Sequence, residues 1–274
     1  MTLAYDRANA REVRAARLPC CRTVLTLLLL LVGMGTCFYM RASKETSQGQ
    51  RQGRLRKLFR ENGLSIVMFG LFAVFWGGQI LTGWYSYNEE QREHGQPTVS
   101  YGAYLRSGEF IEATFENWES EFLQMGAFVV LAALLKQKGS GESKKIDGEN
   151  EVDKDPRKER RPDSPGPVHR GGLALKLYSH SLSLALFGLF LFAFAMHAIG
   201  GLKLFNEEQL QHGQQAVTFW QYVSGSKFWF ESFQNWQSEF LSVGVLVVLS
   251  IFLRQKGSPE SKPVHAPHRE TEGA

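Results

Sequence analysis

The chain has 274 residues, a formal net charge of +4 and a pI near 8.9. This positive charge is too weak to indicate a nucleic-acid partner. The mean hydropathy of -0.22 suggests a soluble protein, but long apolar runs alternate with three strongly charged stretches, which predicts an integral membrane protein.

The first 59 residues form an N-terminal extension that contains one apolar stretch, Thr23 to Met40. This stretch fits a signal anchor or an extra span. Basic residues lie on both sides of it, and because positive charge favours the cytoplasm, a true span here would force one basic segment outward. Translation that begins at Met40 would remove the conflict.

Two segments are long enough to cross a bilayer, since a hydrocarbon core of roughly 30 Å needs about 20 helical residues. They are Leu64 to Trp84 and Leu182 to Leu202. Two further segments, Phe122 to Leu135 and Phe240 to Leu253, contain about 14 residues each and are shorter than a full span.

The residues before each short segment follow a helical period, with aromatic side chains on one face. We expect each to be an amphipathic helix at the membrane interface, with its aromatic face in the headgroups, that turns into or continues as the short span. In the first segment this face comprises Ile111, Phe115, Trp118 and Phe122, and the opposite face carries Glu109, Glu112, Glu116 and Glu119. In the second segment it comprises Trp229, Phe233, Trp236 and Phe240.

The chain contains an internal repeat. A shift of 118 residues aligns Leu64 to Lys144 with Leu182 to Lys262 without a gap, and about 36 of the 81 positions are identical, far beyond chance. We expect an all-α membrane protein: a tandem repeat of two-span helical hairpins that forms a four-helix bundle with interfacial amphipathic helices, plus a possible extra N-terminal span. The predicted divisions are an extension at 1–59, repeats at 60–138 and 178–256, a disordered charged linker at 139–177 and a disordered tail at 257–274.

The distribution of charge predicts the topology. Each copy has an even number of spans, so both should enter the membrane in the same direction, related by an axis along the bilayer normal. The linker is rich in lysine and arginine, whereas the loops inside each copy carry few basic residues beside several carboxylates. The linker and the C-terminus should therefore be cytoplasmic.

Several motifs recur in order in both copies. The run Arg60-Glu61-Asn62-Gly63-Leu64-Ser65 precedes NEEQ with HG, then NWESEFLQ, then KQKGS or RQKGS ending in ESK. This series resembles an uncharacterised family of bacterial integral membrane proteins, over roughly residues 60 to 145 and 178 to 262. The resemblance implies a location in the bacterial inner membrane and no assigned activity, so it supplies no functional residues. The second copy departs from the pattern at its start, where Tyr178-Ser179-His180-Ser181 replaces Arg-Glu-Asn-Gly.

The NEEQ to HG motif has two interpretations. Glu90 with His94, and Glu208 with His212, are four residues apart, and two such pairs at a pseudo-twofold axis could bind a divalent metal. The alternative is helix capping, with Asn88 as the N-cap, the glutamates at the positive end of the helix and Gly95 as its stop. No ExxH or HExxH spacing strengthens the metal interpretation.

A second candidate site lies beside the short spans. Glu121 and Glu239 fall near membrane depth, where a carboxylate is costly unless it is paired, hydrated or used. If the copies face each other, these two carboxylates could form a polar funnel or a proton-titrating pair that also includes Asn117, Asn235 and the neighbouring serines. The alternative is that each glutamate sits at the water boundary near the N-terminal end of its helix.

Gln79 and His197 occupy equivalent places in the two longer spans. At that depth each should face protein or a cavity rather than lipid. A hydrogen bond that fixes helix packing is one role, and a place on a polar pathway is the other.

No nucleophile elbow, Walker loop, dinucleotide fingerprint or paired catalytic aspartate signature occurs. The leading hypothesis is therefore a nonenzymatic structural or interaction module of the cell envelope, without a cofactor. A small transporter or channel with paired glutamates between the repeats is the alternative, and an envelope enzyme with a glutamate and histidine metal centre is a third. The expected partners are the lipid bilayer and either a second copy or another membrane protein.

Overall fold

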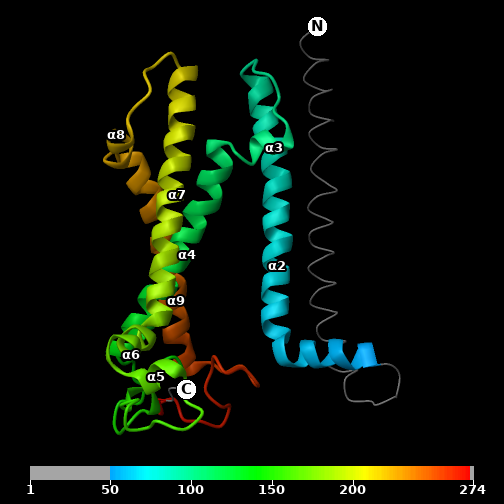
Figure 1. The fold of residues 1–274 in the computed structure, drawn as a ribbon. Helices are drawn as coiled ribbons and strands as arrows, with labels where there is room; N and C mark the ends of the chain where they lie inside the picture. Colours follow the sequence, from blue (N-terminus) through cyan, green and yellow to red (C-terminus); the bar gives the residue numbers. More distant parts are fainter. Residues whose placement is uncertain (1–49, 272–274) are drawn as a thin grey trace. The chain divides into compact units, whose positions relative to one another are not determined.

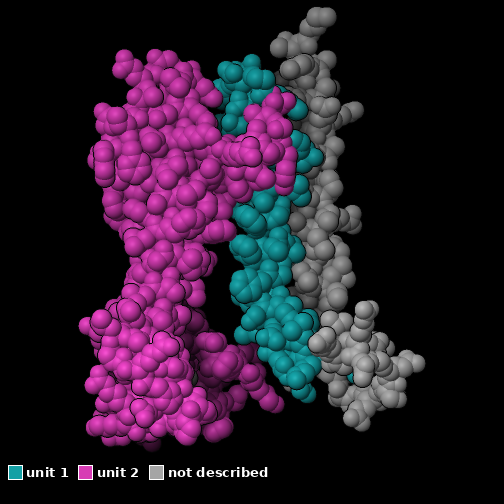
Figure 2. Space-filling view, in the orientation of Figure 1, with its two compact units in different colours: residues 1–97 teal, residues 98–274 magenta. Residues whose placement is uncertain are grey.

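The computed structural model describes residues 50–271. The apolar stretch at 23–40 and Met40 lie outside the described residues, so the predictions made for them stay predictions. Over the described range the chain is helical and has no strand. It divides into two compact units, Met1–Pro97 and Thr98–Ala274, coloured separately in Figure 2.

The described part of the first unit contains one long helix, α2 (Gln50–Glu93), which bends at Asn62. There the backbone leaves the helical region, with φ -131° and ψ 17°, and Asn62 donates a side-chain hydrogen bond to the carbonyl of Leu58 at 3.2 Å. Asparagine and glycine are both poor helix formers, which explains a bend at Asn62-Gly63. The bend is visible within α2 in Figure 1 and separates a basic segment from the apolar one.

The second unit is built on three long helices. Helix α4 (Gly108–Leu134) lies along α7 (Ser181–Gln211) and also contacts α9 (Ser226–Phe252) (Figure 1). The shorter elements are α3 (Tyr101–Tyr104), η1 (Glu151–Asp153), α5 (Gly166–Arg170), α6 (Gly172–Ser179) and α8 (Phe219–Val223). Side chains cap three helix starts, with Ser100, Ser107 and Thr218 as acceptors of backbone N–H groups.

Corresponding elements of the two copies have matching bounds. Adding the offset of 118 to α4 gives 226–252, the bounds of α9, and adding it to Asn62 gives His180, where α6 breaks from α7. Helices α2 and α7 both end before a glycine with positive φ, Gly95 at 68° and Gly213 at 69°. The expected stop at Gly95 is thus confirmed.

The expected helix start at Asn88 is wrong. Asn88 lies inside α2, where its side chain donates to the carbonyl of Trp84 at 3.1 Å. Since the helix continues unbroken from the apolar segment, the NEEQ motif belongs to its last turns instead of to the first turn of a new helix. In the second copy, Asn206 is likewise within α7 and uses its amide to hold the backbone of Val217, at 2.7 and 3.0 Å.

Three of the described helices are long and apolar enough to span a membrane, namely Arg56–Glu93, Ser181–Gln211 and Ser226–Phe252. This agrees with a membrane protein. Helix α4 is not among them, because it contains five glutamates where its counterpart α9 contains two. The packing of α4 on α7 joins the second helix of the first copy to the first helix of the second copy.

Glycines allow α4 and α7 to approach closely. A Cβ atom at Gly108 would overlap the backbone of Leu204 and lie 2.8 Å from the carbonyl oxygen of Gly200. A Cβ atom at Gly200 would in turn lie 2.6 Å from the backbone nitrogen of Glu112. Small residues of this kind let two helix backbones meet, as in many membrane proteins.

The charged linker and the tail form mostly turns in the structure. The KGS turns that follow α4 and α9 place Gly139 and Gly257 at φ 85° and 86°. In each turn a later serine accepts a hydrogen bond from a glutamine backbone, Ser143 from Gln137 and Ser261 from Gln255. The repeated QKGS-x-ES motif thus encodes a local turn, while the disorder expected for 139–177 and 257–274 stays a prediction.

Candidate functional site

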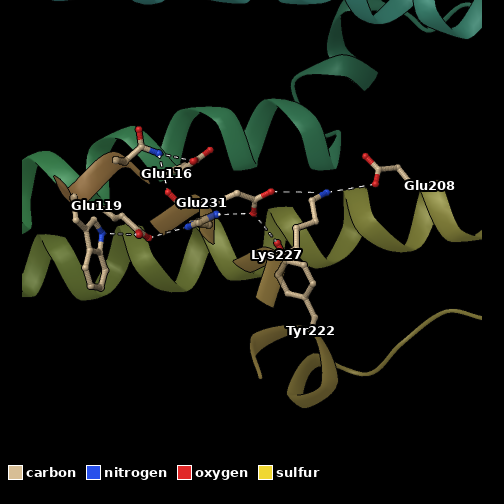
Figure 3. A network of polar contacts seen from close by, with 9 residues as sticks. Glu116, Glu119, Glu208, Tyr222, Lys227 and Glu231 are labelled. Carbon is tan, nitrogen blue, oxygen red and sulfur yellow. Dashed lines mark hydrogen bonds and ion pairs between the residues drawn. The ribbon is translucent and has the colours of Figure 1, made fainter. Parts of the chain in front are cut away.

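Charged side chains gather where α4, α7 and α9 meet. Glu112, Glu116 and Glu119 are three or four residues apart on α4 and so share one helix face. That face meets His197 of α7 and Glu231 of α9 (Figure 3). Glu112 and Glu119 are buried, and Glu116 and Glu231 half-buried, among helices that are otherwise largely apolar. Carboxylates in such a setting are costly unless they are paired, protonated or used.

His197 and Glu119 form the centre of the cluster, and both side chains are 0% exposed. Nδ1 of His197 lies 2.9 Å from Oε2 of Glu119, and Nε1 of Trp236 donates to Oε1 of the same carboxylate at 3.0 Å. Because both carboxylate oxygens face N–H donors, Glu119 fits the ionised form, and Nδ1 is the protonated nitrogen of the ring.

The other ring nitrogen of His197 has no hydrogen-bond partner among the described residues. Nε2 lies 3.9 Å from Oε2 of Glu231, which is too far for a hydrogen bond. Oε1 of Glu112, a residue only 7% exposed, is also buried without a hydrogen bond. One ligand atom from each of Glu112, His197 and Glu231 lies within 4.8 Å of the other two.

A glycine makes room for this arrangement. At Gly201 of α7, a Cβ atom would overlap the hydroxyl of Tyr222 and lie 3.0 Å from Oε1 of Glu112. Tyr222 of α8 donates a long hydrogen bond to Oε2 of Glu231 at 3.5 Å. Burial, followed by the negative charges of Glu112 and Glu231, raises the pKa of the Tyr222 phenol, so this residue remains a donor at neutral pH.

The rim of the cluster contains its one close lysine among the described residues. Nζ of Lys227 lies 3.9 Å from Oε1 of Glu231 and 3.4 Å from Oε2 of Glu208, and 5.5 Å from the centre of the Phe205 ring. On the opposite side, Asn235 donates to Oε1 of Glu116. Figure 3 shows these contacts as a continuous network.

The charges of this network do not balance. Glu112, Glu116, Glu119 and Glu231 contribute four carboxylates, against Lys227 and, if it is protonated, His197. Fully ionised, the cluster would retain two negative charges in a largely apolar setting, which is costly. The arrangement can therefore hold protons on its carboxylates or accept a cation with two positive charges.

The cluster lies close to one end of a candidate span. His197 is five residues before Leu202, the end of the apolar stretch of α7, which places it about 8 Å inside that end at about 1.5 Å per residue. Beyond Leu202 the helix carries Glu207 and Glu208. The cluster is thus within two helical turns of the end that joins the loop between α7 and α9.

The pathway residues expected from the sequence divide into two groups. His197 and Asn235 belong to the cluster. Asn117 is exposed and donates to the carbonyl of Ala113. Glu121 is exposed, on another face of α4 from Glu119, and Glu239 is half-buried within electrostatic range of it. Gln79 is half-buried in α2 of the first unit.

The metal pairs expected from the NEEQ motif lie on exposed helix ends. Glu90 and His94 are exposed, and Nδ1 of His94 lies 2.9 Å from the backbone oxygen of Glu90. Glu208 and His212 are exposed too, and Glu208 pairs with Lys227. Metal binding at these four residues stays a prediction.

The sequence interpretation missed Glu112, Glu119 and Glu231 as site residues. The glutamates of α4 were assigned to the water-facing side of an interfacial helix, but Glu112 and Glu119 are buried. A signal was present: this face differs from the second copy, where Phe230 and Gln237 stand at the positions of Glu112 and Glu119.

Comparison with known proteins identifies a family whose function is unknown. No curated protein and no solved structure was found to match the chain. A family model described as "Domain of unknown function (DUF6766)" matches residues 55–273, which include both copies and the whole glutamate and histidine cluster. The chain belongs to the DUF6766 family.

Proposed function

We propose that the chain is a multi-pass membrane protein that moves small cations across the bilayer, as a small transporter or channel and not as an enzyme. The observation that carries this proposal is a fully buried ion pair: His197 lies in α7, a helix apolar enough to span a membrane, and pairs with Glu119 of the neighbouring helix α4. Ionisable groups at such depth are costly, and in membrane proteins they commonly mark ion or proton pathways.

The unequal charge of the cluster supports cation binding over a purely structural ion pair. A structural pair needs equal and opposite charges that satisfy each other's hydrogen bonds. Here four carboxylates face two basic groups, and Nε2 of His197 and Oε1 of Glu112 have no hydrogen-bond partner among residues 50–271. Atoms of this kind gain a partner when a cation or a proton enters.

The proposal includes the arrangement expected from the sequence. Two copies of a two-span hairpin would form a four-helix bundle and cross the inner membrane of a bacterium in the same direction. The basic linker after α4 would be cytoplasmic, as would the C-terminus, because positive charge favours that side. The cluster would then lie near the periplasmic boundary, and a second chain could complete the assembly.

A nonenzymatic structural or interaction module is the second candidate. It is favoured by the glycine contacts of Gly108 and Gly200, which bring α4 and α7 together as tightly as backbones allow. In this case the cluster would fix the register of the helices, a role known for buried polar groups.

Proteoliposomes separate the two candidates. The purified protein is reconstituted, and a membrane potential drives cations inward while trapped dyes report protons and divalent ions. We expect flux that falls at least tenfold in Glu119→Gln and His197→Gln. Glu159→Gln is the matched control, since it removes the same charge at an exposed site of the same unit. Absence of flux from a folded wild-type protein, or equal flux in all variants, would refute the transport function.

The same assay tests the glutamates predicted beside the short spans. Glu121 and Glu239 belong to the path if the double variant Glu121→Gln/Glu239→Gln loses flux while it remains folded. Unchanged flux in this variant would restrict the path to the cluster around His197.

A further inference from the structure

The three residues around the unpaired nitrogen of His197 have the composition of a metal site. Glu112 from α4, His197 from α7 and Glu231 from α9 each place one ligand atom within 4.8 Å of the other two. Three atoms at such separations surround a point that is at most about 2.8 Å from each of them. Metal–ligand bonds of about 2.0 to 2.2 Å would require only a small inward movement of the side chains.

The hydrogen bond on the far side of the ring supports this interpretation. A metal-binding histidine usually donates its other N–H to a carboxylate, which fixes the tautomer and raises the basicity of the ligand nitrogen. Glu119 accepts from Nδ1 at 2.9 Å, which leaves Nε2 with its lone pair toward Glu231. Trp236 in turn fixes the Glu119 carboxylate through a 3.0 Å hydrogen bond.

We infer that Glu112, His197 and Glu231 bind one divalent first-row transition-metal ion, such as Zn²⁺, Mn²⁺ or Fe²⁺, with Glu119 as the residue that orients His197. This deepens the proposed cation function and rests on it for the physiological role of the ion. One imidazole and two carboxylates favour these ions over Ca²⁺ or Mg²⁺, which prefer oxygen ligands alone. With His197 neutral as a ligand, the four carboxylates and Lys227 leave three negative charges, and an ion of charge +2 neutralises two of them.

The competing state is a protonated His197 between Glu119 and Glu231. In that state Nε2 should donate to Glu231, but the 3.9 Å separation leaves this hydrogen bond unformed. Lys227 lies 3.9 Å from Glu231 and partly neutralises it, and Tyr222 donates a hydrogen bond to it at 3.5 Å. Glu112 has no such contact for its Oε1, so a metal satisfies it whereas an imidazolium on Glu231 does not.

The test uses the full chain in detergent, stripped with a chelator and titrated with Zn²⁺, Mn²⁺ or Co²⁺. We expect one ion per chain by elemental analysis. The visible spectrum of the Co²⁺ form should indicate an ion of low coordination number, and X-ray absorption of the Zn²⁺ form should show one imidazole ligand. Glu119→Gln should weaken binding roughly 10- to 100-fold. His197→Gln and Glu112→Gln should weaken it further and alter the Co²⁺ spectrum.

Two matched controls are Glu159→Gln and His169→Gln, which make the same changes at exposed positions of the linker and should leave the titration unchanged. No stoichiometric ion in the folded wild-type protein would overturn the inference even if a variant failed to fold. So would an ion retained by His197→Gln with an unaltered spectrum. Metal binding without flux in liposomes would refute only the transport function, whereas proton flux without metal binding would refute only the metal site.

Discussion

Substitution of Gly108 by alanine gives the sharpest test of how the site is assembled. The three atoms nearest to the new Cβ atom are all backbone atoms: the nitrogen of Leu204, which it would overlap, the oxygen of Gly200 at 2.8 Å and Cα of Leu204 at 2.9 Å. Backbone cannot rotate away as a side chain can. An ordinary contact begins at 3.4 Å, which is 0.6 Å more than the distance to the Gly200 oxygen, and the nitrogen of Leu204 lies closer still. Helices α4 and α7 must therefore separate by more than 0.6 Å at their closest approach.

The cost follows from known effects of crowding. Overpacking of this kind costs about 1 to 3 kcal/mol, partly offset by the gain of up to about 1 kcal/mol when alanine replaces a helical glycine. We expect Gly108→Ala to lower the free energy of unfolding by about 1 to 2 kcal/mol, measured by tryptophan fluorescence during denaturant titration in detergent.

Gly188→Ala is the matched control, because no atom lies within 4 Å of a Cβ at this position of α7. It should leave stability unchanged or raise it by up to about 1 kcal/mol. If Gly108→Ala proves as stable as Gly188→Ala, the close approach of α4 and α7 is wrong, and the buried cluster that depends on it loses its support.

Three further predictions concern polar residues. Glu119→Gln should destabilise the fold by about 1 to 3 kcal/mol in the same titration, because an amide oxygen cannot satisfy both His197 and Trp236. Glu208→Gln should change stability by less than about 1 kcal/mol, since its ion pair is exposed. Burial, then the charge of Glu109, raises the pKa of Tyr104 from 10.0 to about 12; the folded protein therefore keeps a proton that the unfolded chain releases, and stability should fall as pH rises from about 10 to about 12, a loss that Tyr104→Phe should reduce.

Local features of the fold could be predicted from the sequence. Apolar length gave two of the candidate spans directly, and Gly95 was recognised as a helix stop because only a residue that tolerates positive φ fits there. The contact of His197 with protein also followed from its place in the apolar run, and its side chain is fully buried. These features depend on residues close together in the chain, which is where sequence patterns are most informative.

The partners of each helix could not be predicted in the same way. A helical period separates two faces of α4 but does not say which face meets another helix, and a row of glutamates is normally assigned to water. That assignment failed because Glu112 and Glu119 meet a histidine from the other copy. The Asn88 cap failed for a related reason: the same residues suit the start of a helix or the end of a longer one, and only the continuity of α2 decides.

The two copies have diverged at the positions that build the cluster. The shift of 118 residues relates His197 to Gln79, Glu112 to Phe230 and Glu119 to Gln237, and it relates Gly200 and Gly108 to Thr82 and Ser226. Glu112, Glu119 and His197, with Gly108 and Gly200 beside them, are thus present on α4 and α7 and replaced at the equivalent positions on α9 and α2. The third ligand residue, Glu231, lies on α9 and corresponds to Ala113 of α4. A cluster that served only to hold a hairpin together would be needed in each copy. The cluster occurs once among the described residues, where α4, α7 and α9 meet. A single site of this kind favours a role in binding over a role in holding each copy together.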